Sequence, residues 1–139
     1  MDPKEFCSKL PGVVGFPLTP FHADLSLDLD GLRSNVASMV KQPFTTIVAA
    51  GGTGEMYSLT NEEHVAVVKA VVEAVDGKIP VIAGTGFNRA TGAELARQSA
   101  AVGASAILAF PPYYPGAHFD GLFDYYKAIG DATSLGLMI

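Results

Sequence analysis

The sequence predicts an α/β fold built around a parallel β-sheet. Five short apolar runs, each bounded by turn residues, alternate with stretches that have the 3.6-residue spacing of amphipathic helices. Strands that are buried on both faces are apolar along their whole length, as these runs are, and strand–helix alternation is typical of a parallel sheet covered by helices. No linker-like segment interrupts the alternation. We therefore expect residues 1–139 to form a single domain.

The five predicted strands follow one another at regular intervals. In chain order they are GVVGFPLTPF from Gly12, TTIVAAGG from Thr45, PVIAGTG from Pro80, ASAILAFPP from Ala104 and SLGLMI from Ser134. Their β-branched and small apolar residues suit strands that are buried on both faces.

Amphipathic stretches separate these strands and predict the helices. In the first stretch, one face carries Leu29, Leu32, Val36 and Val40, and in the second it carries Val65, Val68, Val72 and Val75. In the fourth, from about residue 119 to 129, we expect the inward residues to be Phe119, Leu122, Phe123, Tyr126 and Ile129.

Two helix starts carry a capping-box pattern. Thr60 and Glu63 open the second helix, and Thr91 and Glu94 open the third. In this motif each side chain bonds the other residue's backbone N–H, so both pairs are predicted helix N-termini.

Two architectures fit this alternation. One is a small doubly wound sheet of five strands, and the other is the first half of a (β/α)₈ barrel. The last strand, residues 135–139, has no helix after it in the sequence, so its faces and edge need cover from elsewhere. This favours the half barrel.

Composition disfavours several classes of function. A formal net charge of −5 and nine scattered basic residues argue against a nucleic-acid partner. Cys7 is the only cysteine, which leaves no disulfide framework or thiolate metal site. The N-terminal residues lack the apolar core of a signal peptide, and no apolar run has membrane-spanning length. We expect a cytoplasmic protein with no membrane partner, no metal and no cofactor.

The unusual residues gather in the strand-to-helix turns. These turns are PLTPF (residues 17–21), GGTGEMYS (51–58), GTGFN (84–88) and PPYYPGAH (111–118), whereas the helix-to-strand turns are ordinary. In parallel α/β folds the carboxyl ends of the strands carry the chemistry, so we expect the site at that edge.

The second of these turns is the strongest candidate for a binding site. Gly51, Gly52 and Gly54 lack Cβ atoms, so their backbone N–H groups could approach an anion ahead of a helix, and Thr53 adds a hydroxyl. The spacing matches neither the phosphate-binding loop nor the dinucleotide fingerprint, which favours a small carboxylate over a nucleotide. The alternative is a tight turn with no ligand.

Other polar residues are weaker candidates. Tyr113 and Tyr114 lie between prolines that would hold a phenol rigidly, for proton relay or for packing. We expect His22 and His118 to be solvated and His64 to lie on the surface. Glu55 is expected to bond N–H groups of the loop.

Four motifs of the strand-to-helix turns resemble those of a known family. In chain order they are FPLTPF, AAGGTGEMYSLT, VIAGTG and FPPYYP. Together they resemble the dihydrodipicolinate synthase and N-acetylneuraminate lyase family over nearly the whole chain. The resemblance implies a (β/α)₈ barrel of about twice this length. It implies a class I lyase that forms a lysine Schiff base with an α-keto acid, and a homo-oligomer, either a dimer or a tetramer.

The resemblance also implies roles for particular residues. Gly52 and Thr53 would bind the carboxylate of the keto acid, and Thr19 and Gly84, from two neighbouring turns, are predicted to join them in binding substrate. Tyr114 would be catalytic, because it matches a tyrosine that crosses a dimer interface into the partner's proton relay.

Within the family, AAGGTGE resembles the 5-dehydro-4-deoxyglucarate dehydratases, whereas PPYYP resembles the synthases. A dehydratase is therefore the first choice, and 4-hydroxy-tetrahydrodipicolinate synthase or another pyruvate-dependent aldolase is the alternative. None of the six lysines suits an imine at the predicted site, so the chain alone is expected to be inactive. The rivals from other classes are a complete five-stranded binding module and a noncatalytic half barrel that pairs with another half.

Overall fold

The computed structural model describes residues 3–112 and 118–139, which form five strands and five α-helices with one short 3₁₀ helix. The strands are β1 (Val13–Gly15), β2 (Phe44–Ala49), β3 (Val81–Thr85), β4 (Ala106–Ala109) and β5 (Gly136–Met138). The helices are α1 (Pro3–Lys9), α2 (Leu29–Met39), η1 (Met56–Ser58), α3 (Asn61–Val75), α4 (Arg89–Ala101) and α5 (Phe119–Asp131).

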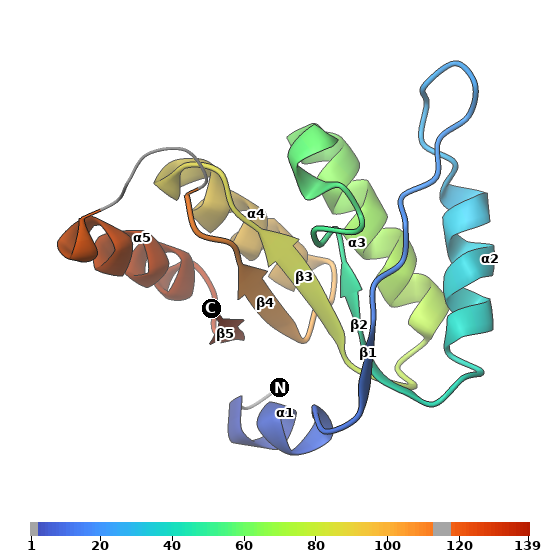
Figure 1. Ribbon diagram of the computed structural model, residues 1–139, viewed down its shortest axis with the longest axis horizontal. Helices are drawn as coiled ribbons and strands as arrows, with labels where there is room; N and C mark the ends of the chain where they lie inside the picture. Colours follow the sequence, from blue (N-terminus) through green and yellow to red (C-terminus); the bar gives the residue numbers. More distant parts are fainter. Residues whose placement is uncertain (1–2, 113–117) are drawn as a thin grey trace.

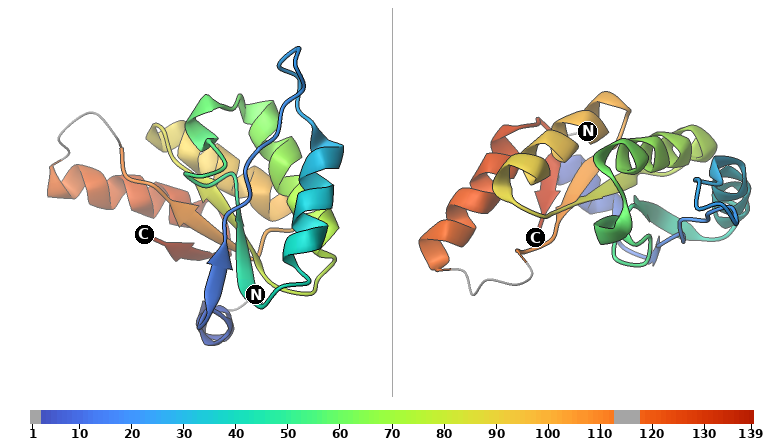
Figure 2. Two further views of the ribbon diagram at one scale, coloured as in Figure 1. Left: turned by 45° about the vertical axis from the view of Figure 1, so that its right-hand side comes forward. Right: turned by 90° about the horizontal axis from the view of Figure 1, so that it is seen from above.

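The strands form one parallel sheet in the order β1-β2-β3-β4-β5 (Figure 1). In a doubly wound sheet the order reverses at a switch point and helices cover both faces. Here each strand neighbours the next in sequence, and α2 to α5 cover one side (Figure 2). The chain has the fold of the N-terminal half of a (β/α)₈ barrel, so the fold expected from the resemblance is confirmed and the doubly wound alternative is wrong.

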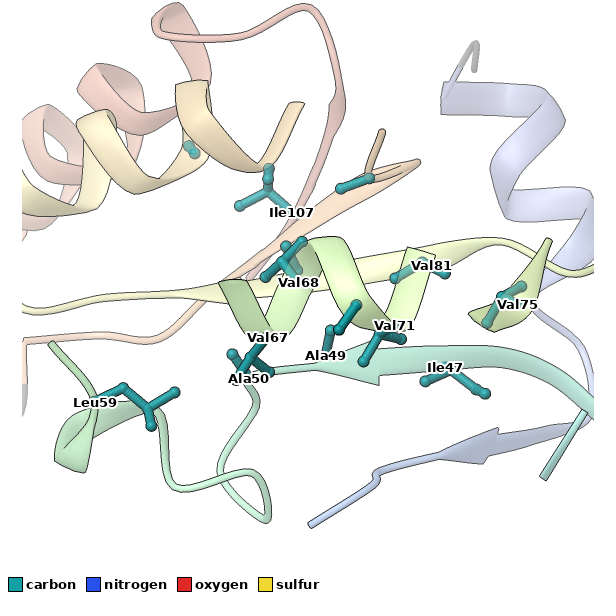
Figure 3. Packing of buried hydrophobic residues seen from close by; sticks show 14 of the residues in the cluster. Ile47, Ala49, Ala50, Leu59, Val67, Val68, Val71, Val75, Val81 and Ile107 are labelled. Carbon is teal, nitrogen blue, oxygen red and sulfur yellow. The ribbon is translucent and has the colours of Figure 1, made fainter. Parts of the chain in front are cut away.

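The main core lies between the sheet and the outer helices. Val67, Val68 and Val71 of α3 pack against β2, where Ile47 and Ala49 are fully buried (Figure 3). Strand residues alternate between the two faces, so Ile47 and Ala49 point to the helices while their neighbour Val48 points to the other face. Burial of these side chains stabilises the fold by about 1.5–3 kcal/mol for each large one.

The inner face of the sheet forms a second, smaller cluster. Val48, Ile82 and Ala106 come from three adjacent strands, and Phe6 of α1 packs on them with 3% of its surface exposed. Helix α1 lies at the amino end of the sheet, away from the strand-to-helix turns (Figure 1). This helix was not predicted, because its seven residues are too few to show a clear apolar period.

Two expectations about helix faces need correction. Phe119 and Phe123 of α5 are 76% and 60% exposed, and the buried residues of that helix are Tyr125 and Ile129. The apolar stripe of α5 is wider than the contact it makes with α4, so part of it stays uncovered in the described chain. In α3, Val67 and Val71 are buried, whereas the expected Val65 and Val72 are only half-buried, because α3 packs on the sheet and on two helices.

The structure confirms one capping box and corrects the other. The Thr60 hydroxyl accepts from Glu63 N, and the Glu63 carboxylate accepts from Thr60 N. Helix α4 instead begins after Asn88, whose side-chain oxygen Oδ1 accepts hydrogen bonds from Ala90 N and Thr91 N. An asparagine three residues upstream takes the cap because its short side chain reaches the first free N–H groups.

The position of this cap can be tested by substitution. Asn88→Ala should lower the free energy of unfolding by about 1 kcal/mol, because it leaves two N–H groups without their acceptor. Thr91→Ala is the matched control and should cost clearly less, since that residue lies inside the first turn. Urea titration followed by circular dichroism measures both. A larger loss for Thr91→Ala would restore the cap expected from the sequence.

Candidate functional site

The strand-to-helix turns meet at one edge of the sheet. All five strands are parallel, so the turns after β1, β2, β3 and β4 leave the same edge, at the top of Figure 1. At that edge the segment after β2 has the most unusual backbone. We call residues 51–54, Gly-Gly-Thr-Gly, the glycine–threonine loop.

The glycine–threonine loop is held between two residues with left-handed backbone. Ala50 has φ of 47° and Glu55 has φ of 54°, although both carry a Cβ atom. Such a conformation costs a non-glycine residue about 1–2 kcal/mol and persists where surrounding contacts enforce it. Here the Met56 N–H donates to Gly51 O at 3.2 Å and the Glu55 N–H donates to Gly52 O at 3.1 Å. The Glu55 side chain makes no capping bond, so its expected bond to loop N–H groups is not formed.

Gly52 and Thr53 form the open part of the glycine–threonine loop. Both are exposed, and a Cβ atom built on Gly52 would meet no atom within 4 Å. The φ of Gly52 lies outside the left-handed region, so neither backbone nor packing requires glycine there. The Thr53 hydroxyl makes no hydrogen bond to another described residue. This open backbone beside a hydroxyl is consistent with the expected carboxylate contact, which stays a prediction.

Thr19 supports the glycine–threonine loop from the turn after β1. Its hydroxyl donates to Gly54 O at 2.8 Å, and the side chain is half-buried. The structure therefore brings Thr19 to the loop, as the predicted site requires. Because its proton is used on Gly54 O, Thr19 could offer a ligand only an acceptor lone pair. Its role in substrate binding stays a prediction.

Gly84, near the end of β3, lies directly beside the start of the glycine–threonine loop. A Cβ atom there would overlap the carbonyl oxygen of Ala50 and lie 2.9 Å from its carbonyl carbon. The Gly84 residue is buried, and its own carbonyl oxygen lies 2.7 Å from Nε2 of His64. The glycine is thus required by the close approach of two strands. A direct contact of Gly84 with substrate stays a prediction.

His64 is buried, which differs from the position that the sequence predicts. It was expected on the surface, but only 1% of it is exposed. Burial lowers the pKa of His64, although its hydrogen bond to Gly84 O acts in the opposite direction. The available signal was its register, because His64, Val67, Val68 and Val71 recur at helical spacing on one buried face of α3.

An aromatic group lies next to this edge. Tyr57 packs edge-on against Phe87 with ring centroids 5.1 Å apart, and the Tyr125 hydroxyl donates to Phe110 O at 2.8 Å. Burial, with contributions from neighbouring tyrosines, raises the pKa of Tyr125 to about 12, so this hydroxyl stays protonated and keeps donating. The predicted catalytic Tyr114 lies outside the described residues.

The remaining polar candidates are exposed. His22 and His118 are exposed, as expected. All six lysines are exposed as well, and Lys41 and Lys78 precede β2 and β3 at the opposite edge from the glycine–threonine loop. Within residues 3–112 and 118–139, no group of three or more His, Cys, Asp or Glu side chains could hold a metal ion.

The sheet order and the loop at its carboxyl edge place the chain among the (β/α)₈-barrel proteins. Comparison with known proteins identifies its family. The profile of the Dihydrodipicolinate synthetase family matches residues 9–139. The chain belongs to this family, which confirms the resemblance noted from the sequence motifs.

Individual relatives agree with this assignment. A protein of Bradyrhizobium sp. (strain ORS 278), named a probable 5-dehydro-4-deoxyglucarate dehydratase, is 38% identical over 140 residues, which cover 100% of this chain and 45% of that protein. The crystal structure of a dihydrodipicolinate synthase from Oceanobacillus iheyensis matches with a TM-score of 0.92 and 31% identity, over 98% of this chain and 46% of that one. A dihydrodipicolinate synthase from Acinetobacter baumannii, crystallised with pyruvate, matches with a TM-score of 0.87 and 36% identity, over 92% and 44% of the two chains.

The chain spans a little under half the length of these relatives. In the part of the chain that the structure describes, no helix is long and apolar enough to cross a membrane.

Two glycines of this edge should respond differently to an added methyl group. Gly84→Ala should lower the free energy of unfolding by about 1–3 kcal/mol or more, because its Cβ would overlap backbone that cannot move aside. Gly52→Ala should be neutral or stabilise by up to about 1 kcal/mol, because the site is open and alanine restricts the unfolded chain. Chemical denaturation of the two variants measures the difference. Equal losses would show that the two sites are equally packed.

The titration of His64 predicts a pH dependence of stability. Its folded-state pKa lies below the unfolded value of about 6.5, so the unfolded chain binds a proton first as the pH falls. Stability from this group is therefore complete above about pH 7 and declines from near pH 6.5 down to the lowered pKa. His64→Gln removes the titrating group and leaves the neighbouring Glu62 and Glu63 unchanged.

Urea denaturation of wild type and variant across pH 4–8 measures the effect. The free energy of unfolding of the wild type minus that of the variant should be constant at high pH. Below about pH 6.5 this difference should fall, because only the wild type loses stability through His64. Parallel curves for the two proteins would contradict the prediction.

Proposed function

We propose that these residues form the carboxylate-binding half of a class I lyase that acts on an α-keto acid through a lysine Schiff base. The best candidate activity is that of a 5-dehydro-4-deoxyglucarate dehydratase, the name carried by the Bradyrhizobium relative. The relatives are about twice as long as this chain, so the proposal concerns the longest natural form of the protein that contains these residues.

The observation that carries this proposal is the open glycine–threonine loop at the carboxyl edge of the sheet. Gly52 leaves open space beside the backbone, and Thr53 presents an exposed hydroxyl. Thr19 holds Gly54 by a hydrogen bond, and Gly84 packs against Ala50 at the start of the loop. The site has no lysine or arginine near it in sequence, so backbone N–H groups and a hydroxyl would bind the acid group. Such groups suit a small carboxylate better than a multiply charged phosphate chain.

The proposed chemistry uses the keto group beside that carboxylate. A lysine amine forms a C–N bond to the keto carbon, and the keto oxygen leaves as water to give an imine. A proton then leaves the carbon next to the imine, and the electron pair expels a hydroxyl from the following carbon as a second water. Loss of the distant carboxylate as CO₂ and hydrolysis of the imine would complete the reaction of a C6 keto-diacid and free the lysine.

The nucleophile must come from residues other than those described. An amine that attacks a carbonyl at neutral pH has to lose its proton, which burial near the site favours. All six lysines of this chain are exposed and so lack that environment. We therefore expect the 139 residues alone to bind a keto acid weakly and to turn over none. Tyr114 remains the proposed catalytic tyrosine.

A second candidate is a pyruvate-dependent synthase such as 4-hydroxy-tetrahydrodipicolinate synthase. It is favoured by the PPYYP segment, which resembles that of the synthases, and by the similarity to the synthase crystallised with pyruvate. A cytoplasmic location and a homodimer or homotetramer belong to the same proposal.

Trapping the imine tests the mechanism. The longest natural form of the protein should gain a covalent adduct when it is treated with borohydride and pyruvate or 5-dehydro-4-deoxyglucarate, because hydride reduces the C=N bond to a stable amine. Mass spectrometry reads the adduct, and the keto acid that gives turnover separates dehydratase from synthase. Absence of any adduct would overturn the Schiff-base mechanism.

Thr53→Val in the same protein tests the site. It should weaken keto acid affinity by about tenfold or more, because it removes a hydrogen bond to a charged group. Thr45→Val, at the opposite edge of the sheet, is the control and should leave the affinity unchanged.

A further inference from the structure

His64 is buried behind the candidate site and belongs to none of the roles proposed so far. It lies on the first turn of α3, directly after the Thr60–Glu63 capping box that fixes the start of this helix. Only 1% of the residue is exposed, so it cannot act as a solvated acid or base. A polar ring in this position needs a partner, and Gly84 O provides one at 2.7 Å.

The chemistry of that contact fixes the state of the ring. A carbonyl oxygen carries no proton, so Nε2 of His64 must donate. Nδ1 is buried and has no hydrogen-bond partner among the described residues. A proton on Nδ1 would place an uncompensated charge in the protein interior. The ring is therefore the neutral Nε2–H tautomer, with Nδ1 as an unused acceptor.

The Gly84 residue connects the His64 hydrogen bond to the glycine–threonine loop, because it contacts the backbone where the loop begins. The Cα of Gly84 faces the carbonyl group of Ala50 so closely that no Cβ atom fits, and Gly51 Cα is also within 3.2 Å of that Cβ position. Ala50 is the left-handed residue from which the loop departs. A shift of the Gly84 peptide would therefore move Ala50 and the start of the loop with it.

The geometry points to His64 as a positioning residue for the glycine–threonine loop: its Nε2–H holds the Gly84 carbonyl, and Gly84 in turn fixes the backbone of Ala50 and Gly51. His64 does not touch the bound acid. It acts by holding the loop N–H groups in one arrangement. The position of His64 is itself fixed, because the capping box at Thr60 holds the first turn of α3. Only the identity of the ligand in this inference rests on the proposed function.

Two variants of His64 separate the effect of its hydrogen bond to Gly84 O from the effect of replacing a buried ring. In His64→Gln the side-chain amide nitrogen can reach the place of Nε2 and donate to Gly84 O. In His64→Asn the amide is shorter and corresponds to Nδ1, so the bond to Gly84 O is lost. Both are neutral and polar, so a difference between them reports the hydrogen bond.

Thr46→Val is the matched control. The Thr46 hydroxyl is fully buried and donates to Pro80 O at 2.9 Å, so it makes the same kind of bond at the opposite edge of the sheet. It should lower stability without changing the loop.

The experiment uses the longest natural form of the protein. It measures pyruvate binding, the kinetics with whichever keto acid gives turnover, and the ¹H–¹⁵N shifts of Gly52 and Thr53 without ligand. We expect His64→Asn to raise KM or Kd by about three- to tenfold with a smaller change in kcat, as for a lost buried hydrogen bond. His64→Gln should restore most of this affinity. The loop shifts should change in His64→Asn and stay close to wild type in Thr46→Val.

Equal affinities and unchanged loop shifts in His64→Asn would overturn the positioning role. If His64→Asn does not fold, the ring nitrogen shifts of wild type and the loop shifts of His64→Gln decide: a protonated Nδ1, or large loop changes despite the retained donor, would overturn it. If wild type binds no keto acid, the proposed function fails, while the loop shifts and the ring tautomer still test the role of His64.

Discussion

The site depends on the close approach between the Cα of Gly84 and the carbonyl group of Ala50, where β2 and β3 reach the same edge of the sheet. This contact allows the chain to leave β2 through a left-handed alanine and to expose Gly52 and Thr53 above the edge. Backbone packing of this kind is rigid, because neither partner has a side chain that can rotate aside. The hydrogen bond from His64 adds a second restraint on the same peptide.

The sheet has to bury two faces, and the chain covers them by different means. Helices α2 to α5 cover the outer face, while the inner face of Val48, Ile82 and Ala106 is closed at one end by Phe6 of α1. This one-sided arrangement is what distinguishes a barrel segment from a doubly wound sheet. It also places every strand-to-helix turn at the same edge, where residues distant in sequence, Thr19 and Gly54, are joined by a hydrogen bond.

Local signals predicted well where the interaction is local. The Thr60–Glu63 capping box is present as expected, because both of its bonds join residues three apart. The second box failed because Asn88, just outside the pattern, reaches the same N–H groups. The inward face of α5 was wrong at Phe119 and Phe123, since apolar spacing shows which residues can be buried and not which neighbour covers them.

The sequence by itself determined the alternation of strands and helices, the parallel sheet, the turns that carry polar residues and the family to which the chain belongs, because these follow from apolar periodicity and short motifs. Only the tertiary structure decided which glycines are needed: packing against Ala50 requires glycine at position 84, whereas no contact requires it at position 52. It also decided that Thr19 supports the loop and that His64 is buried. Those facts depend on distances between residues 20 to 35 positions apart, which are set by strand pairing and helix packing and have no local pattern in the sequence.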